Sequence, residues 1–260
     1  MKFAITGKGG VGKTTLTALL AQGFADQGKE VLAVDADPSP CLAEALGFPD
    51  TLRKKLHPIS EMDELIEERT GAKPGTIGGF FTLNPRVDDI PERFSVVHRK
   101  VRLLEMGSVD IGGSGCICPE GAMLKTLFTH LLFRNDEILL LDMYAGVEHL
   151  GRATVDFVDA MIIVVEPTRR SIGTATQIKK LAMDIGLNRL LLVGNKVRGE
   201  LDERFIQDEN PGIPILGFLP SDQVVQDSDR KGLPVYDNAP SLRIATDLMI
   251  DKIETMEFGR

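Results

Sequence analysis

A glycine-rich loop near the N-terminus carries two lysines and two threonines in a pattern suited to binding phosphate. Residues 7–15 read GKGGVGKTT, which fits the motif G-x-x-x-x-G-K-S/T between an apolar run and a helical stretch. Glycines let backbone N–H groups turn toward an anion, and the helix start adds its positive end. Lys13 would contact the β- and γ-phosphates, and the Thr14 hydroxyl would bind Mg²⁺. The predicted phosphate-binding residues are Gly7, Lys8, Gly9, Gly10, Val11, Gly12, Lys13, Thr14 and Thr15.

Carboxylates stand at the ends of two further apolar runs. Asp35 and Asp37 close the run at 30–35, and Asp142 follows three leucines. Ligands of open parallel sheets bind at the carboxyl ends of the strands, so these side chains are expected beside the phosphate loop. Asp142 would hold Mg²⁺ directly or through water, and Asp37 would orient the water that attacks the γ-phosphate. The alternative for Asp35 and Asp37 is a purely structural role as turn formers.

A third motif concerns the base of the nucleotide. Residues 195–198 read NKVR, which is similar to the base-reading N-K-x-D of guanine-nucleotide proteins. Arg198 carries only donors and cannot accept the two hydrogen bonds that a guanine edge offers. We therefore expect adenine, with Asn195 on its edge and Lys196 beside it. ATP or ADP is the predicted nucleotide.

Two of the three cysteines form a close pair, Cys116 and Cys118, in the sequence GGSGCICPE at 112–120. Pro119 suits the first position of a helix over 119–133, which places Cys118 near the N-cap, where the helix dipole lowers the pKa of a thiol. Two thiolates make half of a four-sulfur centre, which two copies of the chain in a two-fold dimer would complete. Zn²⁺, Ni²⁺ and an iron–sulfur cluster all suit such a centre. The alternative is a pair of reduced surface thiols.

The elements that must position these residues follow from the hydrophobic pattern. Short runs rich in Val, Ile and Leu alternate with amphipathic stretches, which is typical of strands buried on both faces by crossover helices. We predict an α/β fold, a P-loop NTPase with a mostly parallel twisted sheet flanked by helices on both faces, as one domain over 1–260. The expected strands are 2–6, 30–35, 101–106, 137–142, 160–165, 189–194 and 213–219. The expected helices are 14–27, 61–69, 119–133, 171–185 and 241–256, and 71–93 is expected to be an insertion.

Composition excludes several classes of function. The chain has 260 residues, 30 Lys+Arg against 38 Asp+Glu and a formal charge of −8, so it has no general attraction to nucleic acid or anionic lipid. Its apolar runs are far shorter than the roughly 18 residues of a membrane span. Three cysteines are too few for a disulfide scaffold. We expect a cytoplasmic protein without a membrane or nucleic-acid partner.

The additional lysine of the loop, Lys8, resembles the signature of the deviant Walker A ATPases, which include the MinD, ParA, arsenite-pump and nitrogenase iron-protein families. The resemblance implies a homodimer in which Lys8 reaches the nucleotide of the other subunit. It also implies that Asp37 positions the attacking water, so that Lys8, Lys13 and Asp37 are the catalytic residues. Pro220 and Asp222 fall where this class lines the base pocket. The alternative for Lys8 is a solvated surface lysine.

A narrower resemblance covers nearly the whole chain. The sequence looks like the CooC-type nickel-insertion ATPases that mature carbon monoxide dehydrogenase and the related acetyl-CoA synthase. The match is carried by LNP at 83–85, DIPE at 89–92, GGSGCICPE at 112–120, DMYAGVEHLGR at 142–152, VVEP at 164–167 and SI at 171–172. It implies a dimeric ATPase that binds Ni²⁺ or Zn²⁺ between subunits through Cys116 and Cys118 and serves such a nickel enzyme. Tyr144 departs from the family, where this position is often acidic.

Two other functions share the nucleotide motifs. A MinD- or ParA-like partitioning ATPase would show a basic amphipathic last helix or a cluster of Lys and Arg. Here the 241–256 helix has a slightly acidic polar face, and the main basic cluster is the short run at 53–55. An iron–sulfur carrier remains the second alternative. Cys41, early in an expected helix, is predicted to be a buried thiol. His149 is predicted to make a structural or signalling contact, and the alternative is a transient metal ligand.

Overall fold

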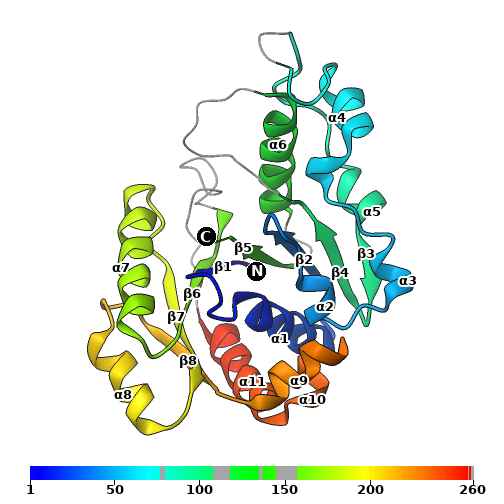
Figure 1. Cartoon of the computed structure of the whole chain (residues 1–260). Helices are drawn as coiled ribbons and strands as arrows, with labels where there is room; N and C mark the ends of the chain where they lie inside the picture. The colour runs from blue at the N-terminus through cyan, green and yellow to red at the C-terminus, as the bar shows by residue number, and fades with distance from the viewer. Residues whose placement is uncertain (77–79, 108–117, 135–136, 145–156, 257, 259–260) are drawn as a thin grey trace.

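The computed structural model describes residues 1–76, 80–107, 118–134, 137–144, 157–256 and 258 (Figure 1). Its strands form one sheet in the order β3-β4-β2-β5-β1-β6-β7-β8, in which all neighbours are parallel except β3 and β4. The mostly parallel α/β fold is confirmed. The strands are β1 Lys2–Gly7, β2 Val31–Ala36, β3 Val96–His98, β4 Val101–Glu105, β5 Ile138–Met143, β6 Ala160–Val165, β7 Leu190–Val197 and β8 Ile215–Pro220.

The helices include the five that we predicted and several others. The predicted helix at 119–133 has the predicted ends, and the others shift by one or two residues. They are α1 Lys13–Asp26, α2 Leu42–Ala45, α3 Asp50–Arg53, α4 Asp63–Thr70, α5 Ile90–Phe94, α6 Pro119–Phe133, α7 Arg169–Asp184, α8 Glu200–Glu209, α9 Gln223–Lys231, α10 Val235–Asn238 and α11 Pro240–Thr255, with a 3-10 turn at Ile59–Glu61. The expected insertion at 71–93 reaches into α5.

Helices cover both faces of the sheet, because the central strands are apolar on both sides. One face packs against α1, α2, α10 and α11, and the other packs against α4 to α8. In Figure 1, α1 and α11 lie together on one side of the sheet, and α4 and α6 pack side by side on the other. Along β5, Ile138 and Leu140 face α1, whereas Leu139 and Leu141 face away from it. This alternation places Asp142, the next even-numbered residue, on the α1 side.

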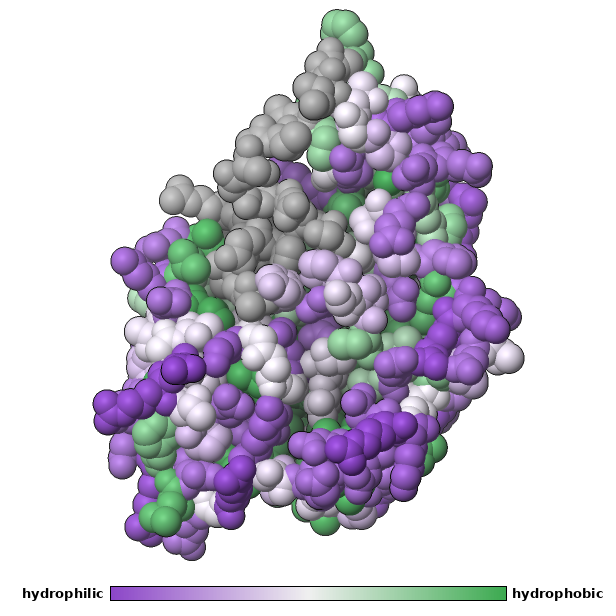
Figure 2. Space-filling view, in the orientation of Figure 1, coloured by the Kyte–Doolittle hydropathy of each residue, from purple (hydrophilic) through white to green (hydrophobic). Residues whose placement is uncertain are grey.

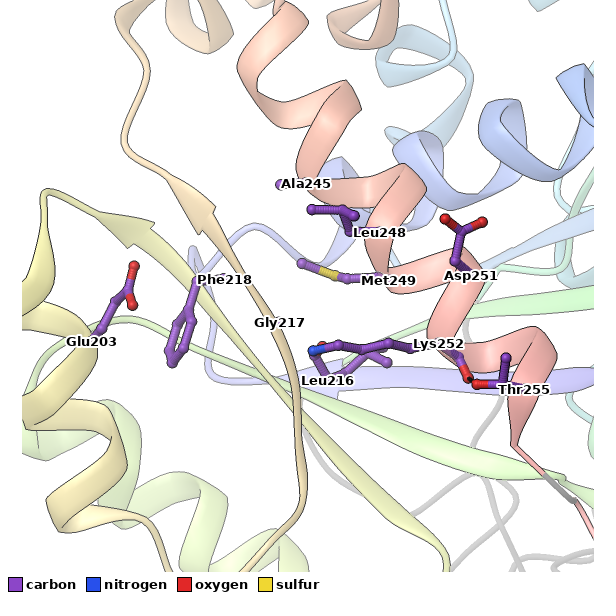
Figure 3. A pocket seen from close by; sticks show the side chains of 10 residues that line it. All are labelled: Glu203, Leu216, Gly217, Phe218, Ala245, Leu248, Met249, Asp251, Lys252 and Thr255. Carbon is purple, nitrogen blue, oxygen red and sulfur yellow. Dashed lines mark hydrogen bonds between the residues drawn. The ribbon is translucent and has the colours of Figure 1, made fainter.

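The last helix packs tightly on the edge strand β8, as Figure 3 shows. Gly217 allows this approach, because a Cβ there would lie 2.8 Å from the side chain of Met249. Lys252 Nζ donates a hydrogen bond to the Leu216 carbonyl at 2.8 Å. Leu248 and Phe218 line the shallow groove beside this contact. The last helix α11 thus packs against the fold through β8 and α1.

The surface in Figure 2 is mostly polar, and the apolar residues of its coloured part lie in small groups. Exposed apolar side chains include Phe80, Ile244 and Leu248. Within the described ranges, none of the helices is both long enough and apolar enough to span a bilayer.

Candidate nucleotide and metal site

The phosphate loop connects the central strand β1 to the buried helix α1. Gly12 is the N-cap residue of α1, with a φ of +95° that favours glycine, and no side chain caps the first turn. The N–H groups of that turn therefore point into the loop, where a phosphate would accept from them. Lys13 begins the helix and is only 8% exposed. The loop thus has the geometry of an anion site.

Two side chains at the end of β7 fasten this loop to the sheet. Asn195 is 5% exposed, and its Nδ2 donates to the Val11 carbonyl at 2.7 Å while its Oδ1 accepts from the N–H of Lys196 at 2.8 Å. Lys196 Nζ donates to the Gly10 carbonyl at 2.6 Å and lies 3.4 Å from a carboxylate oxygen of Glu166. The structure therefore gives Asn195 a loop-positioning role, and its contact with an adenine edge stays a prediction.

Acidic residues line the carboxyl edge of three neighbouring strands. Asp35 of β2 is in register with Asp142 of β5 on one side and with Glu105 of β4 on the other. Asp35 is fully buried, and its carboxylate accepts from the N–H groups of Asp37, Cys41 and Leu42 at 3.1, 2.9 and 2.9 Å. Burial raises the pKa of Asp35, although these three hydrogen bonds act in the opposite direction and lower it. Its role is structural, because it fixes the turn after β2.

Asp142 is as buried as Asp35, but its carboxylate lacks the hydrogen bonds that Asp35 makes. It is 1% exposed, and neither carboxylate oxygen has a hydrogen-bond partner in the described part of the chain. Burial raises the pKa of Asp142 to about 7, while the neighbouring Thr14 hydroxyl and Lys13 ammonium lower it. The Thr14 hydroxyl lies close by but does not reach normal hydrogen-bond geometry. A buried carboxylate without a partner is costly unless a cation meets it, so Asp142 and Thr14 fit a Mg²⁺ ion.

Two of the three predicted catalytic residues, Asp37 and Lys8, lie at the rim of this site. Asp37 is partly exposed, and its Oδ1 accepts from the N–H of Ser39 at 2.9 Å. Lys8 is partly exposed as well, and its ammonium makes neither a hydrogen bond nor an ion pair with the residues that the structure describes. Both side chains are thus accessible to a ligand, and their catalytic roles stay predictions.

Cys41 corrects one of our expectations. The residue is exposed rather than buried, and it stands at the N-cap of the short helix α2. Its Sγ donates to the Thr14 Oγ1 at 3.6 Å. Although the residue is exposed, its thiol is partly shielded from water, and this desolvation raises the pKa of the Cys41 thiol, as do the nearby carboxylates of Asp35, Asp37 and Asp142. The hydrogen bond to Thr14 lowers that pKa. Sequence reasoning missed this neighbour of the Thr14 hydroxyl, because 27 residues separate the two side chains.

The described member of the cysteine pair lies where its sequence context predicts. Cys118 is the N-cap residue of α6, with Pro119 in the first turn, and it is partly exposed. A Cβ on Gly121 would lie 3.1 Å from its Sγ, so the sulfur rests against the first turn of the helix. The N–H of Gly75 donates to Glu120 at 3.3 Å, which ties the 71–93 segment to the same turn.

The residues expected beside the base lie at the end of β8. Pro220 is the last residue of this strand, and Asp222 caps α9. Asp222 accepts from the N–H of Val224 at 2.9 Å and from the hydroxyl of Ser241 at 2.8 Å. Both of its oxygens thus have partners within the fold. A contact of Pro220 or Asp222 with a base stays a prediction.

Comparison with known proteins agrees with this geometry. Residues 2–235 match the model of the family described as the CobQ/CobB/MinD/ParA nucleotide binding domain. The chain is 48% identical over 243 residues to the carbon monoxide dehydrogenase accessory protein CooC of Rhodospirillum rubrum, covering 94% of this chain and 92% of that protein. The chain belongs to the CooC-type ATPases of the MinD/ParA family. It is accordingly a nucleotide-binding ATPase.

Two further comparisons of this CooC-type chain concern a relative that is similar in sequence and a solved structure that is similar in fold. An uncharacterized ATP-binding protein of Methanocaldococcus jannaschii is 46% identical over 238 residues, covering 90% of this chain and 91% of that protein. The solved MinD cell division protein of Aquifex aeolicus superposes with a TM-score of 0.69 over 100% of this chain and 99% of that one, at 22% identity. At that identity the likeness shows the fold alone.

Several motif residues of the CooC-type resemblance lie outside the described residues. They are residues 112–117, which include Cys116, and residues 145–152, which include His149. In the part of the chain that the structure describes, no three His, Cys, Asp or Glu side chains are grouped to hold a metal ion. A cysteine metal centre therefore stays a prediction.

Proposed function

We propose that this CooC-type ATPase binds nickel and presents it to an enzyme of the carbon monoxide dehydrogenase or acetyl-CoA synthase type. The observation that carries the proposal is 48% identity over 94% of the chain to a carbon monoxide dehydrogenase accessory protein. The sequence C-x-C-P-E at 116–120 supports it, because paired thiolates suit Ni²⁺ as well as Zn²⁺.

The nucleotide is proposed to lie in the phosphate loop as ATP or ADP. The N–H groups of residues 7–15 would hold the phosphates, and Lys13 would neutralise the β- and γ-phosphate charge. Mg²⁺, held by Thr14 and Asp142, would neutralise charge that develops on the phosphate oxygens. Asp37 would orient the attacking water at the rim of the site. Adenine would lie near Asn195, Lys196, Pro220 and Asp222.

The nickel cargo is proposed to bind between two copies of the chain. Cys116 and Cys118 of each copy would supply four sulfur ligands around the two-fold axis. The position of Cys118 at the N-cap of α6 supports this, since the helix N-terminus favours a thiolate. Lys8 would reach the nucleotide of the other copy and make the dimer depend on ATP.

The path of the chain supports coupling between the two sites. β4 ends beside Asp35, where the N–H of Met106 donates to the Asp35 carbonyl at 2.8 Å. The chain then leads from residue 107 to Cys118 at the start of α6. A change at the nucleotide edge would therefore act on the segment that carries both cysteines.

The test of this function is metal binding by the full chain. Replacing Cys116 and Cys118 by Ser should abolish binding of one nickel per two chains, measured by equilibrium dialysis, and should leave ATP binding unchanged. The unchanged ATP affinity serves as the control for folding. Nickel binding that survives both substitutions would refute the cysteine site.

We also propose that the protein is cytoplasmic and acts without a membrane or nucleic-acid partner. The net charge of −8 and the packing of α11 against α1 and β8 support this, because the last helix is occupied within the fold and its polar face is not basic. Co-sedimentation with liposomes or DNA in the presence of ATP is the test. Clear binding would favour a partitioning ATPase instead.

A further inference from the structure

A thiol lies beside the hydroxyl that we assign to Mg²⁺. Cys41 Sγ is 3.6 Å from Thr14 Oγ1, and α2 packs against α1 at this point (Figure 1). The N–H of Cys41 donates to Asp35 at 2.9 Å, and Asp35 is fully buried. The backbone of Cys41 is therefore anchored, and the sulfur is held at the edge of the nucleotide site.

A second observation points to a cation at the same place. Asp142 is 1% exposed and has no hydrogen-bond partner in the described residues. Its carboxylate is near enough to raise the pKa of the Cys41 thiol, and the Thr14 hydroxyl is near enough to lower the pKa of Asp142. Asp35 is fully engaged by backbone N–H groups and leaves no free oxygen of this kind. One sulfur, one hydroxyl and one unpaired carboxylate thus converge on the site.

The separation of sulfur and oxygen fits two ligands of one metal ion. In a tetrahedral site, a metal–oxygen distance of about 2.1 Å and a metal–sulfur distance of about 2.3 Å place the two ligand atoms roughly 3.6 Å apart. The Sγ–Oγ1 distance is 3.6 Å. The pair therefore needs little movement to bind one ion.

We infer that Cys41, Thr14 and Asp142 form a second, thiol-containing site that binds a thiophilic divalent cation such as Zn²⁺, Co²⁺ or Ni²⁺ in place of Mg²⁺. Mg²⁺ takes oxygen ligands and leaves the sulfur unused, whereas a softer ion takes all three donors and releases the thiol proton to solvent. A phosphate oxygen of bound nucleotide is a candidate fourth ligand. The inference rests on the proposed assignment of Thr14 and Asp142 to the nucleotide's metal ion, and it is independent of Cys116 and Cys118.

This site would make the ATPase sensitive to the metal that it carries. Free Ni²⁺ or Zn²⁺ would compete with Mg²⁺ at the nucleotide. The alternative is that Cys41 merely donates a hydrogen bond to Thr14 and binds no metal.

The experiment uses the full chain with Cys116 and Cys118 replaced by Ser, so that Cys41 is the one remaining cysteine. Co²⁺ is added anaerobically with ADP, and the sulfur-to-cobalt charge-transfer band is recorded in the near ultraviolet. We expect this band to saturate at one Co²⁺ per chain. Adding Cys41→Ser should abolish the band and weaken Zn²⁺ binding at least tenfold, while Mg²⁺ binding changes less than about twofold.

A matched control moves the thiol by two residues. Ser39 is exposed on the same loop and makes no hydrogen bond to Thr14 in the described part of the chain, so Ser39→Cys combined with Cys41→Ser keeps one cysteine on the loop without the Thr14 contact. This chain should show no band. Absence of the band with Cys41 present, or an equal band from the moved thiol, would overturn the inference. Either result would leave the nickel-binding test at Cys116 and Cys118 unaffected, so the two proposals fail separately.

Discussion

At the scale of single residues, two aspartates on neighbouring strands show how partners decide a role. Asp35 and Asp142 are paired in register and are both almost fully buried. Asp35 accepts three backbone N–H groups, whereas Asp142 has no partner in the described part of the chain. The first carboxylate stabilises a turn, and the second is available for a cation. The folded chain without ligand therefore retains an unfavourable buried charge at Asp142 above about pH 7, where this carboxyl is ionised.

Replacing Asp142 by Asn should separate stability from activity. The substitution removes the unpaired charge, so the free energy of unfolding of the nucleotide-free chain should rise by about 1 kcal/mol. ATP hydrolysis with Mg²⁺ should fall more than about tenfold, because a metal ligand is lost. Asp35→Asn is the matched control and should lower stability, since it disturbs three hydrogen bonds. Urea unfolding and phosphate release are the measurements, and a loss of stability in both variants would contradict this account of Asp142.

The sequence predicted the residues of local motifs better than the contacts between distant ones. Lys13, Thr14 and Asp142 lie in short patterns whose chemistry fixes their position relative to a strand or helix end. The bond from Asn195 to Val11 joins residues 184 apart, and the contact from Cys41 to Thr14 depends on how α2 packs on α1. Such contacts are decided by tertiary packing, so no local spacing indicated them.

At the scale of secondary structure, the same reasoning explains which elements were predicted. The central strands are continuous apolar runs because helices cover both of their faces. β3 was missed because it has three residues at the sheet edge, and none of them is buried. α8 was missed because only Ile206 is buried among its ten residues. Elements with few buried side chains leave a weak pattern.

The turn between β1 and α1 should be far more sensitive at Gly12 than at Gly10. Both residues have a positive φ, +95° and +78°, so alanine costs about 1 kcal/mol of backbone strain at either. A Cβ on Gly12 would also lie 2.1 Å from Asn195 Nδ2, whereas one on Gly10 meets no atom within 4 Å. Relief of that clash would break the bond to Val11. Gly12→Ala should thus cost about 2 kcal/mol more than Gly10→Ala in urea unfolding without nucleotide. Equal losses would contradict the packing of Asn195 on the loop.

The acidic edge of β2, β4 and β5 predicts a pH-dependent stability. Burial and the charges of Asp35 and Glu61 raise the pKa of Glu105 from 4.5 to about 7. Between these values the folded chain holds a proton that the unfolded chain has released, so this group's contribution to stability is lost as pH rises. Glutamine resembles the protonated carboxyl, so Glu105→Gln should leave stability unchanged below pH 4.5 and increase it above pH 7. The expected increase is only about 1 kcal/mol, because Glu105 is partly exposed and solvent screens its charge.

The control for Glu105 is Glu67→Gln, an exposed residue of α4. The free energy of unfolding of the Glu67→Gln variant should change with pH in the same way as that of the unsubstituted chain. If the two variants gave the same profile, the acidic edge would not be the source of the effect.

At the scale of the whole molecule, the chain brings an accessible lysine and an anion site to one loop. Each copy carries a net charge of −8, so two copies repel one another unless local cations meet anions across the contact. The Lys8 ammonium makes no hydrogen bond or ion pair with the described residues of its own chain. A phosphate of nucleotide bound to a second copy would supply its partner. Association should therefore depend on ATP.

Replacing Lys8 by Ala should uncouple ATP binding from association. The unsubstituted chain should have the mass of two chains with ATP and of one chain without nucleotide, measured by light scattering after size exclusion. Lys8→Ala should keep its affinity for ATP within about threefold and remain a single chain. It should hydrolyse ATP at least about tenfold more slowly, because a charge that stabilises the transferring phosphoryl group is lost. Lys13→Ala is the matched control, and it should lose ATP binding itself, because its ammonium belongs to the site of its own chain. If Lys8→Ala associates normally with ATP, then Lys8 does not connect the two copies, and the four-sulfur centre must depend on another contact.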